Sequence, residues 1–169
     1  MAKLVLTLVG DDRAGLVQVL ADAVAAHGGN WERSELAELA GAFAGIVLVS
    51  VPDDRLDALT AELNRLDGLL HITPHTGAEA PDAPTGEQFV FTVLGNDRPG
   101  VVREITHALV QQGLSIDRFT SRTLKAPMAG GALFEATVSV RAGEDGDLAA
   151  AVAELERLAG EIQVDLTVA

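Results

Sequence analysis

The sequence predicts an α+β protein built from two similar domains, each with the element order βαββαβ. The first observation is an internal repeat, because residues 4–17 read LVLTLVGDDRAGLV and residues 89–102, 85 positions later, read FVFTVLGNDRPGVV. Each copy runs from an apolar segment of strand length through a glycine-bounded turn into an amphipathic segment. The second observation is a later match at an offset of 92 residues, which pairs Leu56, Leu63 and Leu66 with Leu148, Leu155 and Leu158. In a chain of 169 residues, such a repeat indicates two small domains.

The first copy opens with an apolar run of strand length, residues 3–9. In the turn that follows, Asp12 is the predicted N-cap of a helix and Gly15 is expected in its first helical turn. Gly28 and Gly29 are expected to end this helix. Helical spacing is visible at Leu16, Leu20, Val24 and His27.

Three further strands and one helix complete the first copy. Residues 30–39 fit either a strand or a helix, and we predict a strand because residues 114–124, at the same place in the second copy, are richer in Ile, Phe and Thr. Residues 43–51 predict another strand. Pro52, Asp53 and Asp54 then open a second helix, which Gly68 ends, and residues 69–76 give a last short strand.

The second copy repeats this order after a linker. Residues 77–87 contain two Pro and two Gly without apolar periodicity. The predicted organisation is therefore domain 1 at residues 1–76, a linker at 77–87 and domain 2 at 88–169. Residues 125–131 predict a loop that the first copy lacks, which explains the change of offset. The other predicted elements are strands at 89–94, 114–124, 133–141 and 162–168, a helix from Asp97 to Gly113 and a helix containing Leu148, Val152, Leu155 and Leu158.

A βαββαβ domain can place both helices on one face of a four-stranded antiparallel sheet, the ferredoxin-like arrangement. The other face of the sheet is then uncovered. In the strand at residues 43–51 both sides are apolar, since Ile46, Leu48 and Ser50 alternate with Val47, Val49 and Val51. We therefore predict that open faces or edges pair, between domains or between subunits of a homodimer. The alternative is a single two-layer domain with partly buried strands.

Composition excludes several classes of function. The formal net charge is −13, and both halves of the chain are acidic. Direct nucleic-acid binding and adhesion to an anionic membrane are therefore not expected. The absence of cysteine removes disulfides and thiolate chemistry. The N-terminal apolar run is too short for a signal peptide, so we expect a cytoplasmic protein.

No catalytic cluster, metal site or cofactor motif is apparent in the sequence. His71 and His75 are four residues apart, but Thr73 and Pro74 between them indicate an extended chain, where that spacing is about 13 Å and does not suit a metal. An acylphosphatase-like enzyme would need an Arg in a phosphate loop beside an Asn. Arg98 and Asn96 approximate this pair, but the adjacent Asp97 would repel a phosphate. We expect a protein that is not an enzyme.

The repeated turn is the candidate ligand site. Its first glycine permits a sharp exit from the strand, and its second, Gly15 or Gly100, lets a ligand approach the free amides at the start of the helix. Those amides attract a carboxylate, while carboxylate and amide side chains can accept hydrogen bonds from an ammonium group. Together these groups suit an amino acid, which carries both charges. A purely structural turn remains the alternative, because an Asp acting as N-cap would use the same amides. The acceptor side chains are Asp11, Asp12, Asn96 and Asp97.

A strand that runs into a D-R-x-G-[VL] turn resembles the ACT domain, a small-molecule-sensing module of amino-acid metabolism. Two such domains resemble the glycine cleavage system transcriptional repressor family. The resemblance implies a regulatory protein whose effector lies near the first turn, often against the second strand of another ACT domain. The ligand-binding residues it implies are Asp11, Asp12, Arg13, Gly15, Leu16 and Asn30 in the first copy, and Asn96, Asp97, Arg98, Pro99, Gly100, Val101, Ser115 and Ile116 in the second.

Two functions therefore compete. The first is an amino-acid sensor that would act on transcription through a protein partner, given its charge. The second is a scaffold that binds no ligand and assembles through its sheet faces. Ala14 replaces the proline of the second copy, Pro99, so we expect the second copy to sense if only one does.

Overall fold

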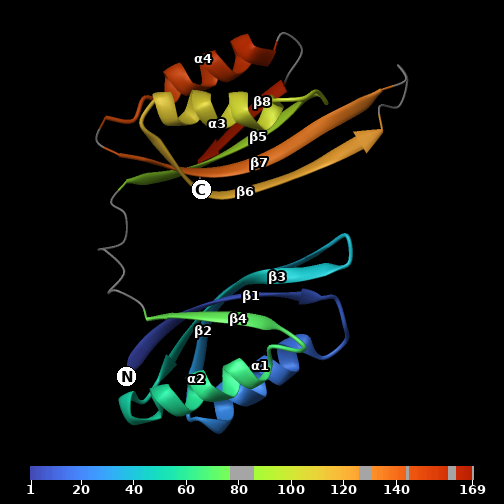
Figure 1. The fold of residues 1–169 in the computed structure, drawn as a ribbon. Coiled ribbons are helices and arrows are strands. Elements are labelled where there is room, and N and C mark those ends of the chain that lie inside the picture. Colours follow the sequence, from blue (N-terminus) through green and yellow to red (C-terminus); the bar gives the residue numbers. More distant parts are fainter. Residues whose placement is uncertain (77–85, 126–130, 144, 160–162, 169) are drawn as a thin grey trace. The chain divides into compact units, whose positions relative to one another are not determined.

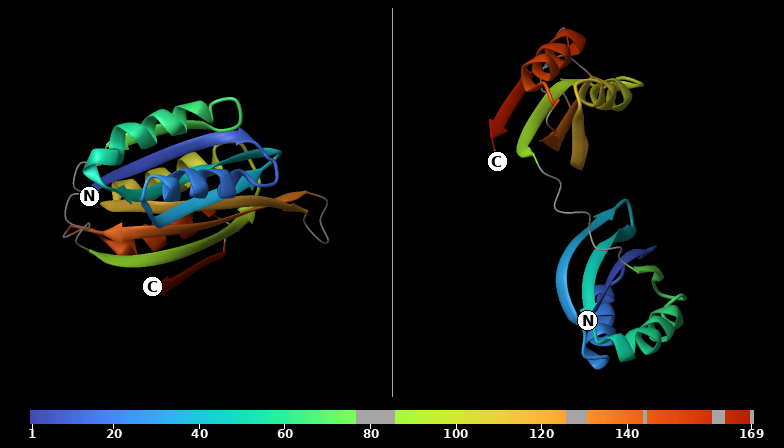
Figure 2. Two further views of the ribbon diagram at one scale, coloured as in Figure 1. Left: turned by 90° about the horizontal axis from the view of Figure 1, so that it is seen from below. Right: turned by 90° about the vertical axis from the view of Figure 1, so that its left-hand side faces the viewer.

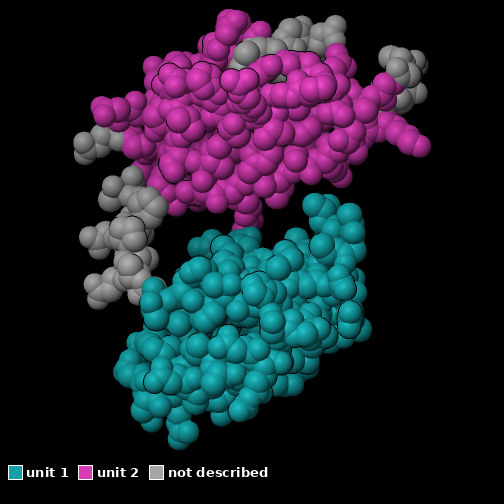
Figure 3. Space-filling model, in the orientation of Figure 1, with its two compact units in different colours: residues 1–81 teal, residues 82–169 magenta. Residues whose placement is uncertain are grey.

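Each half of the chain forms a four-stranded antiparallel sheet with two helices on one face (Figure 1). The computed structural model describes residues 1–76, 86–125, 131–143, 145–159 and 163–168, with side chains described through residue 157. The chain divides into unit 1, residues 1–81, and unit 2, residues 82–169 (Figure 3). The predicted α+β fold with two ferredoxin-like βαββαβ domains is confirmed. The predicted linker, residues 77–87, lies outside the described residues except for its last two, and Glu87 already begins a strand.

Unit 1 has the strand order β2-β3-β1-β4, and unit 2 has the matching order β6-β7-β5-β8. The elements of unit 1 are β1 (Ala2–Asp11), α1 (Leu16–Ala26), β2 (Asn30–Leu39), β3 (Ala42–Val51), a 3₁₀ turn η1 (Asp53–Arg55), α2 (Leu56–Arg65) and β4 (His71–Thr76). The elements of unit 2 are β5 (Glu87–Asn96), α3 (Val101–Gln111), β6 (Leu114–Lys125), β7 (Ala132–Ala142), α4 (Leu148–Ala159) and β8 (Gln163–Val168).

The core of unit 1 follows directly from the sequence pattern. Alternate strand residues point to one face, and Leu4, Leu6 and Leu8 of β1 are at most 4% exposed. Val47, Val49 and Val51 of β3 pack beside them, also buried. Helices α1 and α2 cover this face of the sheet (Figure 2). Their buried leucines recur at helical spacing. Unit 2 has its own core, built in the same way around Phe91, Val138, Ile105 and Leu155.

The opposite face of the unit 1 sheet is apolar and accessible, as the alternation in β3 predicts. Ile46 and Val9 are each 48% exposed, and Leu48 is half-buried. Ser50, expected on the same side, is buried instead, at 7% exposed. That these faces pair with another domain or subunit stays a prediction.

The change of offset between the copies arises mainly at one hairpin. In unit 1, Ala40 and Gly41 alone join β2 to β3, with φ of 52° and 83°. In unit 2, six residues separate Lys125 from Ala132, and five of them, 126–130, lie outside the described residues. The strand registers Leu6–Val47 and Phe91–Val138 place β7 91 residues after β3. One more residue is gained before α4, which accounts for the offset of 92.

Each unit also carries a β-bulge that the sequence pattern does not predict. The register of β2 shifts between Trp31 and Arg33, and that of β6 shifts between Ile116 and Arg118. The extra residue in each strand is acidic, Glu32 or Asp117. Their positions differ by 85, so the bulge belongs to the repeat.

Candidate functional site

The repeated turn has nearly the same backbone in both units. In unit 1, Gly15 is the N-cap of α1, with φ 91° and ψ 0°, and in unit 2, Gly100 is the N-cap of α3, with φ 90° and ψ −3°. This left-handed conformation favours glycine. Neither helix start has a side-chain cap. The prediction that Asp12 is the N-cap is therefore wrong, because the glycine three residues later turns the chain into the helix. The corresponding start of α3 lies after Gly100, not at Asp97.

The turn is fixed to the neighbouring hairpin by its backbone. The Asp12 N–H donates to the Gly41 carbonyl at 2.8 Å, and the Asp97 N–H donates to the Ala132 carbonyl at 2.9 Å. Gly10 is needed for packing, since a Cβ there would lie 2.7 Å from the Leu69 carbonyl oxygen. The first glycine of unit 1 thus accommodates the chain before β4, a reason different from the sharp strand exit that the sequence predicts.

The charged side chains of the two turns make different contacts. In unit 2, the Arg98 guanidinium donates to both oxygens of Glu104, with Nη1–Oε1 at 2.7 Å and Nη2–Oε2 at 2.5 Å. This ion pair raises the pKa of Arg98 and lowers the pKa of Glu104. In unit 1, Arg13 contacts Asp11 through one atom pair at 3.4 Å. Glu104 is not among the residues predicted from the sequence. The signal that points to it is the difference between the copies, since Val19 stands at the matching place in the first.

The turn residues predicted to bind a ligand do lie together within each unit. Asp11, Asp12, Arg13 and Gly15 are exposed, and so are residues 96–100. Leu16 and Val101 are buried core residues, at 3% and 5% exposed. Their side chains belong to the core, and only their backbone can face a ligand.

The three remaining predicted residues, Asn30, Ser115 and Ile116, lie at the opposite end of each sheet from the turn. Asn30 pairs with Ser50, which pairs with Lys3, whereas the turn begins at Asp11. Lys3 and Asp11 are eight positions apart along β1, about 26 Å at the usual rise of a strand. In unit 2, Ser115 pairs with Arg141 at the corresponding far end, and Ile116 packs against the core. No single unit brings these residues to its own turn.

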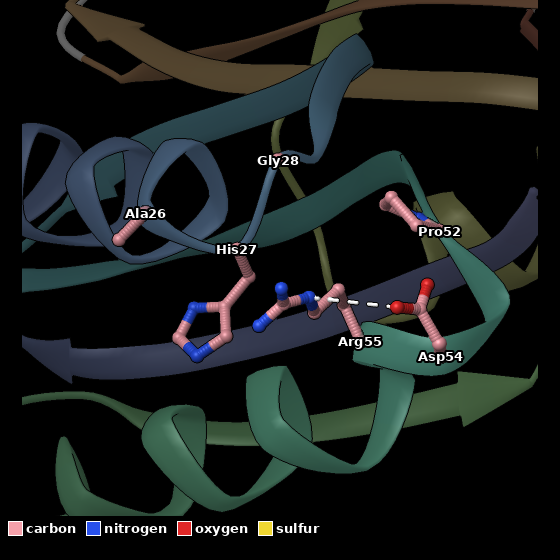
Figure 4. Close-up of a pocket in the computed structure, with 6 residues that line it drawn as sticks. All are labelled: Ala26, His27, Gly28, Pro52, Asp54 and Arg55. Carbon is pink, nitrogen blue, oxygen red and sulfur yellow. Dashed lines mark ion pairs between the residues drawn. The ribbon is translucent and has the colours of Figure 1, made fainter.

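A shallow hollow of about 280 Å³ lies near this far end of unit 1 (Figure 4). His27 and Arg55 project into it, and Arg55 pairs with Asp54 at 3.6 Å. The His27 ring donates from Nδ1 to the Ala23 carbonyl at 2.9 Å. Unit 2 has no such pair of side chains, because Gln112 and Asp147 stand at the positions of His27 and Arg55. The hollow is therefore not part of the repeated site.

The described parts of the chain contain no group of three His, Cys, Asp or Glu side chains placed to hold a metal ion. His71 and His75 both lie on β4, and they contact Asp67 and Thr7 respectively. Among the described helices, none has the length and apolar character needed to span a bilayer.

Comparison with known proteins identifies the family. Residues 2–73 match a model of the ACT domain, and residues 89–160 match a second model of the ACT domain. The chain is a tandem ACT-domain protein. The family supports a ligand-sensing, regulatory role.

Two solved structures resemble this tandem ACT protein over nearly its whole length. The crystal structure of an unknown protein from Galdieria sulphuraria is 28% identical with a TM-score of 0.80, and the match covers 99% of this chain and 98% of that one. The crystal structure of a proposed glycine cleavage system transcriptional repressor is 19% identical with a TM-score of 0.68, covering 98% and 96%. At that identity the second likeness concerns the fold alone. A comparison with curated proteins finds no match.

Proposed function

We propose that this tandem ACT protein is a non-enzymatic regulator that senses an amino acid at its strand–helix turns. The observation that carries the proposal is the pair of glycine N-caps, Gly15 and Gly100, at helix starts without a side-chain cap. A helix start of this kind leaves N–H groups of the first turn without a side-chain partner and open to an anion, although in unit 2 the Val101 N–H donates to the Arg98 carbonyl at 3.3 Å. Asp12, which the sequence predicts as an N-cap, makes no side-chain cap and so does not compete with a ligand for these amides.

The side chains around each turn suit both ends of a zwitterion. The helix N-terminus carries partial positive charge and favours a carboxylate. Asp11 and Asp12 in unit 1, or Asn96 and Asp97 in unit 2, offer oxygen acceptors to an ammonium group. An amino acid bears both groups a few ångströms apart, which makes it the ligand class of choice.

The complete site needs a second ACT domain. Asn30 lies about 26 Å along the strand from the turn of unit 1. Ser115 lies at the corresponding far end of the sheet in unit 2. We therefore infer that they contribute to a turn presented by a second copy of the chain, in a homodimer. The accessible apolar face of unit 1, with Ile46 and Val9, supports self-association of this kind.

The process regulated is inferred from charge and likeness together. A structure of the same fold belongs to a proposed glycine cleavage system transcriptional repressor. With a net charge of −13, this chain would act on transcription through a protein partner in the cytoplasm and would not bind DNA directly. Tight, salt-sensitive binding to promoter DNA in a gel-shift assay would contradict this part.

Thermal unfolding in the presence of each common amino acid tests the sensing function. A ligand at 100 times its dissociation constant stabilises the folded protein by about 2.7 kcal/mol. We expect one or a few amino acids to raise the melting temperature, and calorimetric titration should give the stoichiometry. Failure of every amino acid to shift the transition would refute the proposal.

A charge-matched pair of variants locates the binding. Asp12→Asn removes a carboxylate at the turn, and Asp57→Asn removes an exposed carboxylate on α2, outside the turn. We expect Asp12→Asn to weaken binding about tenfold, the loss of about 1.4 kcal/mol, because an ammonium bond to a charged acceptor is lost. Asp57→Asn should leave the dissociation constant unchanged.

The competing function is a ligand-independent scaffold, and the accessible apolar face of unit 1 favours it. A scaffold would form oligomers through Ile46 and Val9 whose stability does not respond to amino acids. Sedimentation of wild type and Ile46→Ser, with and without the amino-acid mixture, separates the two functions. An acylphosphatase activity is disfavoured, since the Arg98 guanidinium that would hold the phosphate is paired with Glu104.

A further inference from the structure

The space beside the second turn already contains a carboxylate. Glu104 lies at the fourth position of α3, and its backbone N–H donates to the Gly100 carbonyl at 3.0 Å. Its Oε1 lies 4.0 Å from the position that a Cβ would take at Gly100. Both carboxylate oxygens accept from Arg98. The cationic side chain of the second turn, Arg98, is therefore paired with a residue of the helix that follows the turn.

The first turn lacks this internal carboxylate. The residue at the position of Glu104 is Val19, which is half-buried. No atom lies within 4 Å of the position of a Cβ at Gly15. Arg13 makes one contact of 3.4 Å with Asp11, and the two side chains are 58% and 85% exposed. Arg98 and Glu104 are also exposed, at 44% and 36%. The two turns therefore differ in geometry, because a bidentate arginine–carboxylate pair holds the guanidinium more firmly than a single long contact does.

We propose that Glu104 is a built-in occupant of the second turn, which excludes external carboxylates there and leaves the first turn as the effector site. The inference rests on the proposed amino-acid sensing but reverses the order expected from Pro99. The rigidity that Pro99 gives the second turn does not help a ligand carboxylate, because the Glu104 carboxylate already lies beside Arg98. The two ACT domains thereby have separate tasks, with unit 1 binding the effector and unit 2 held in a ligand-independent state.

The ion pair itself can be tested without any ligand. Phenylglyoxal modifies arginine through its neutral form, so a guanidinium held by a carboxylate reacts slowly. We expect Arg98 in the folded wild-type protein to react about tenfold more slowly than Arg13, as quantified by peptide mass spectrometry. Glu104→Val should raise the Arg98 rate to that of Arg13, and the reciprocal Val19→Glu should lower the Arg13 rate. Equal rates for the two arginines in the wild type would overturn the proposal.

Exclusion from the second turn is tested with acetate, the simplest carboxylate probe, in a titration followed by amide NMR. In the wild type, the amides of Leu16 and Val17 should shift with acetate, and those of Val101 and Val102 should not. In Glu104→Val the amides of both turns should shift, whereas in Val19→Glu neither set should. Equal chemical-shift changes at both turns of the wild type would overturn the proposal. So would unchanged amide shifts of Val101 and Val102 in Glu104→Val.

These outcomes are distinguishable from failure of the proposed function. If acetate shifts Leu16 and not Val101 while no amino acid alters the melting temperature, then Glu104 excludes carboxylates as proposed and amino-acid sensing is refuted. If an amino acid stabilises the wild type by binding at Val101 and not at Leu16, sensing is supported and the assignment to unit 1 is overturned. Glu104→Gln, which keeps the shape of the side chain, checks that the charge is responsible, and it should behave as Glu104→Val does.

Discussion

The two first turns have the same backbone and different side-chain chemistry. Their N-cap glycines differ by 1° in φ and 3° in ψ. Each turn is tied to the adjacent hairpin by one backbone hydrogen bond, from the N–H of Asp12 or of Asp97. Yet the residue above the turn is Val19 in unit 1 and Glu104 in unit 2. The comparison teaches that sheet, hairpin and glycine determine the shape of the turn, whereas one position on the helix determines how the arginine of the turn is paired.

The central strands show the same separation between backbone and side chain. Gly45 in β3 and Ala136 in β7 occupy matching positions, paired with Leu8 and Val93 of the neighbouring strand. A Cβ at Gly45 would lie 2.0 Å from the Glu35 carbonyl oxygen, whereas Ala136 is buried with its methyl group in place. The approach of β2 to β3 is thus closer at this point than the sequence repeat implies.

The largest effect is expected from exchanging these two residues. Gly45→Ala should destabilise unit 1 by about 3 kcal/mol, because the added methyl group forces a backbone shift. Ala136→Gly should destabilise unit 2 by only about 1–2 kcal/mol, from backbone entropy and one lost buried methyl group. Urea unfolding followed by Trp31, the single tryptophan, reports on unit 1 because this side chain packs on its core.

Unit 2 needs a matched probe for this measurement. Phe119→Trp in a Trp31→Phe background places a tryptophan against the unit 2 core. If Gly45→Ala cost no more than Ala136→Gly, the two strand pairs would be equally spaced and the comparison would fail. A shift of the unit 2 transition by Gly45→Ala would show that the units do not unfold separately.

A smaller and equal effect is expected at the two turns. Gly15→Ala and Gly100→Ala each place a Cβ at φ near 90°, which costs about 1–2 kcal/mol in the left-handed region. Neither position has an atom closer than 4.0 Å to the new Cβ, so conformation alone sets the cost. The same two tryptophan reporters measure it. Costs that differ by more than the error of the two unfolding curves would show that the turns are not equivalent in backbone.

Much of this architecture was predictable because the repeat tests each assignment twice. Residues 30–39 alone fit a helix or a strand, but the Ile, Phe and Thr of residues 114–124 indicated a strand, and both segments are strands. The alternation of β3 placed Val47, Val49 and Val51 on one side of the sheet, and all three are buried. Periodicity carries this information because burial on one face is a local property of strand and helix.

The details that failed depend on contacts distant in sequence. Asp12 has the chemistry of an N-cap, but the hydrogen bond to Gly41, 29 residues away, holds it outside the helix. Gly10 is explained by Leu69, and the bulges at Glu32 and Asp117 depend on strand registers that no local pattern encodes. The turns were correctly singled out as one place of clustered polar residues. Asn30, Ser115 and Ile116 were placed beside them only through the family resemblance.

The smallest effect on stability is expected from the ion pair that distinguishes the turns, and its pH dependence identifies it. Arg98 holds the pKa of Glu104 below its ordinary value. A carboxyl group with a lowered pKa in the folded state stabilises that state above the ordinary pKa of glutamate, about 4.3, and this contribution is lost as the pH falls through the lowered value. Glu104→Gln should therefore be less stable than wild type near neutral pH and equally stable in acid.

Glu154→Gln, which breaks the exposed pair of Glu154 with Arg157 on α4, is the control for an ordinary helical ion pair. Carbon-13 titration of the two carboxyl groups measures both pKa values directly. After Arg98→Gln, the pKa of Glu104 should rise while that of Glu154 stays unchanged; if the pKa of Glu104 did not move, Arg98 would not be its partner in solution, and the distinction between the turns would have to rest on shape alone.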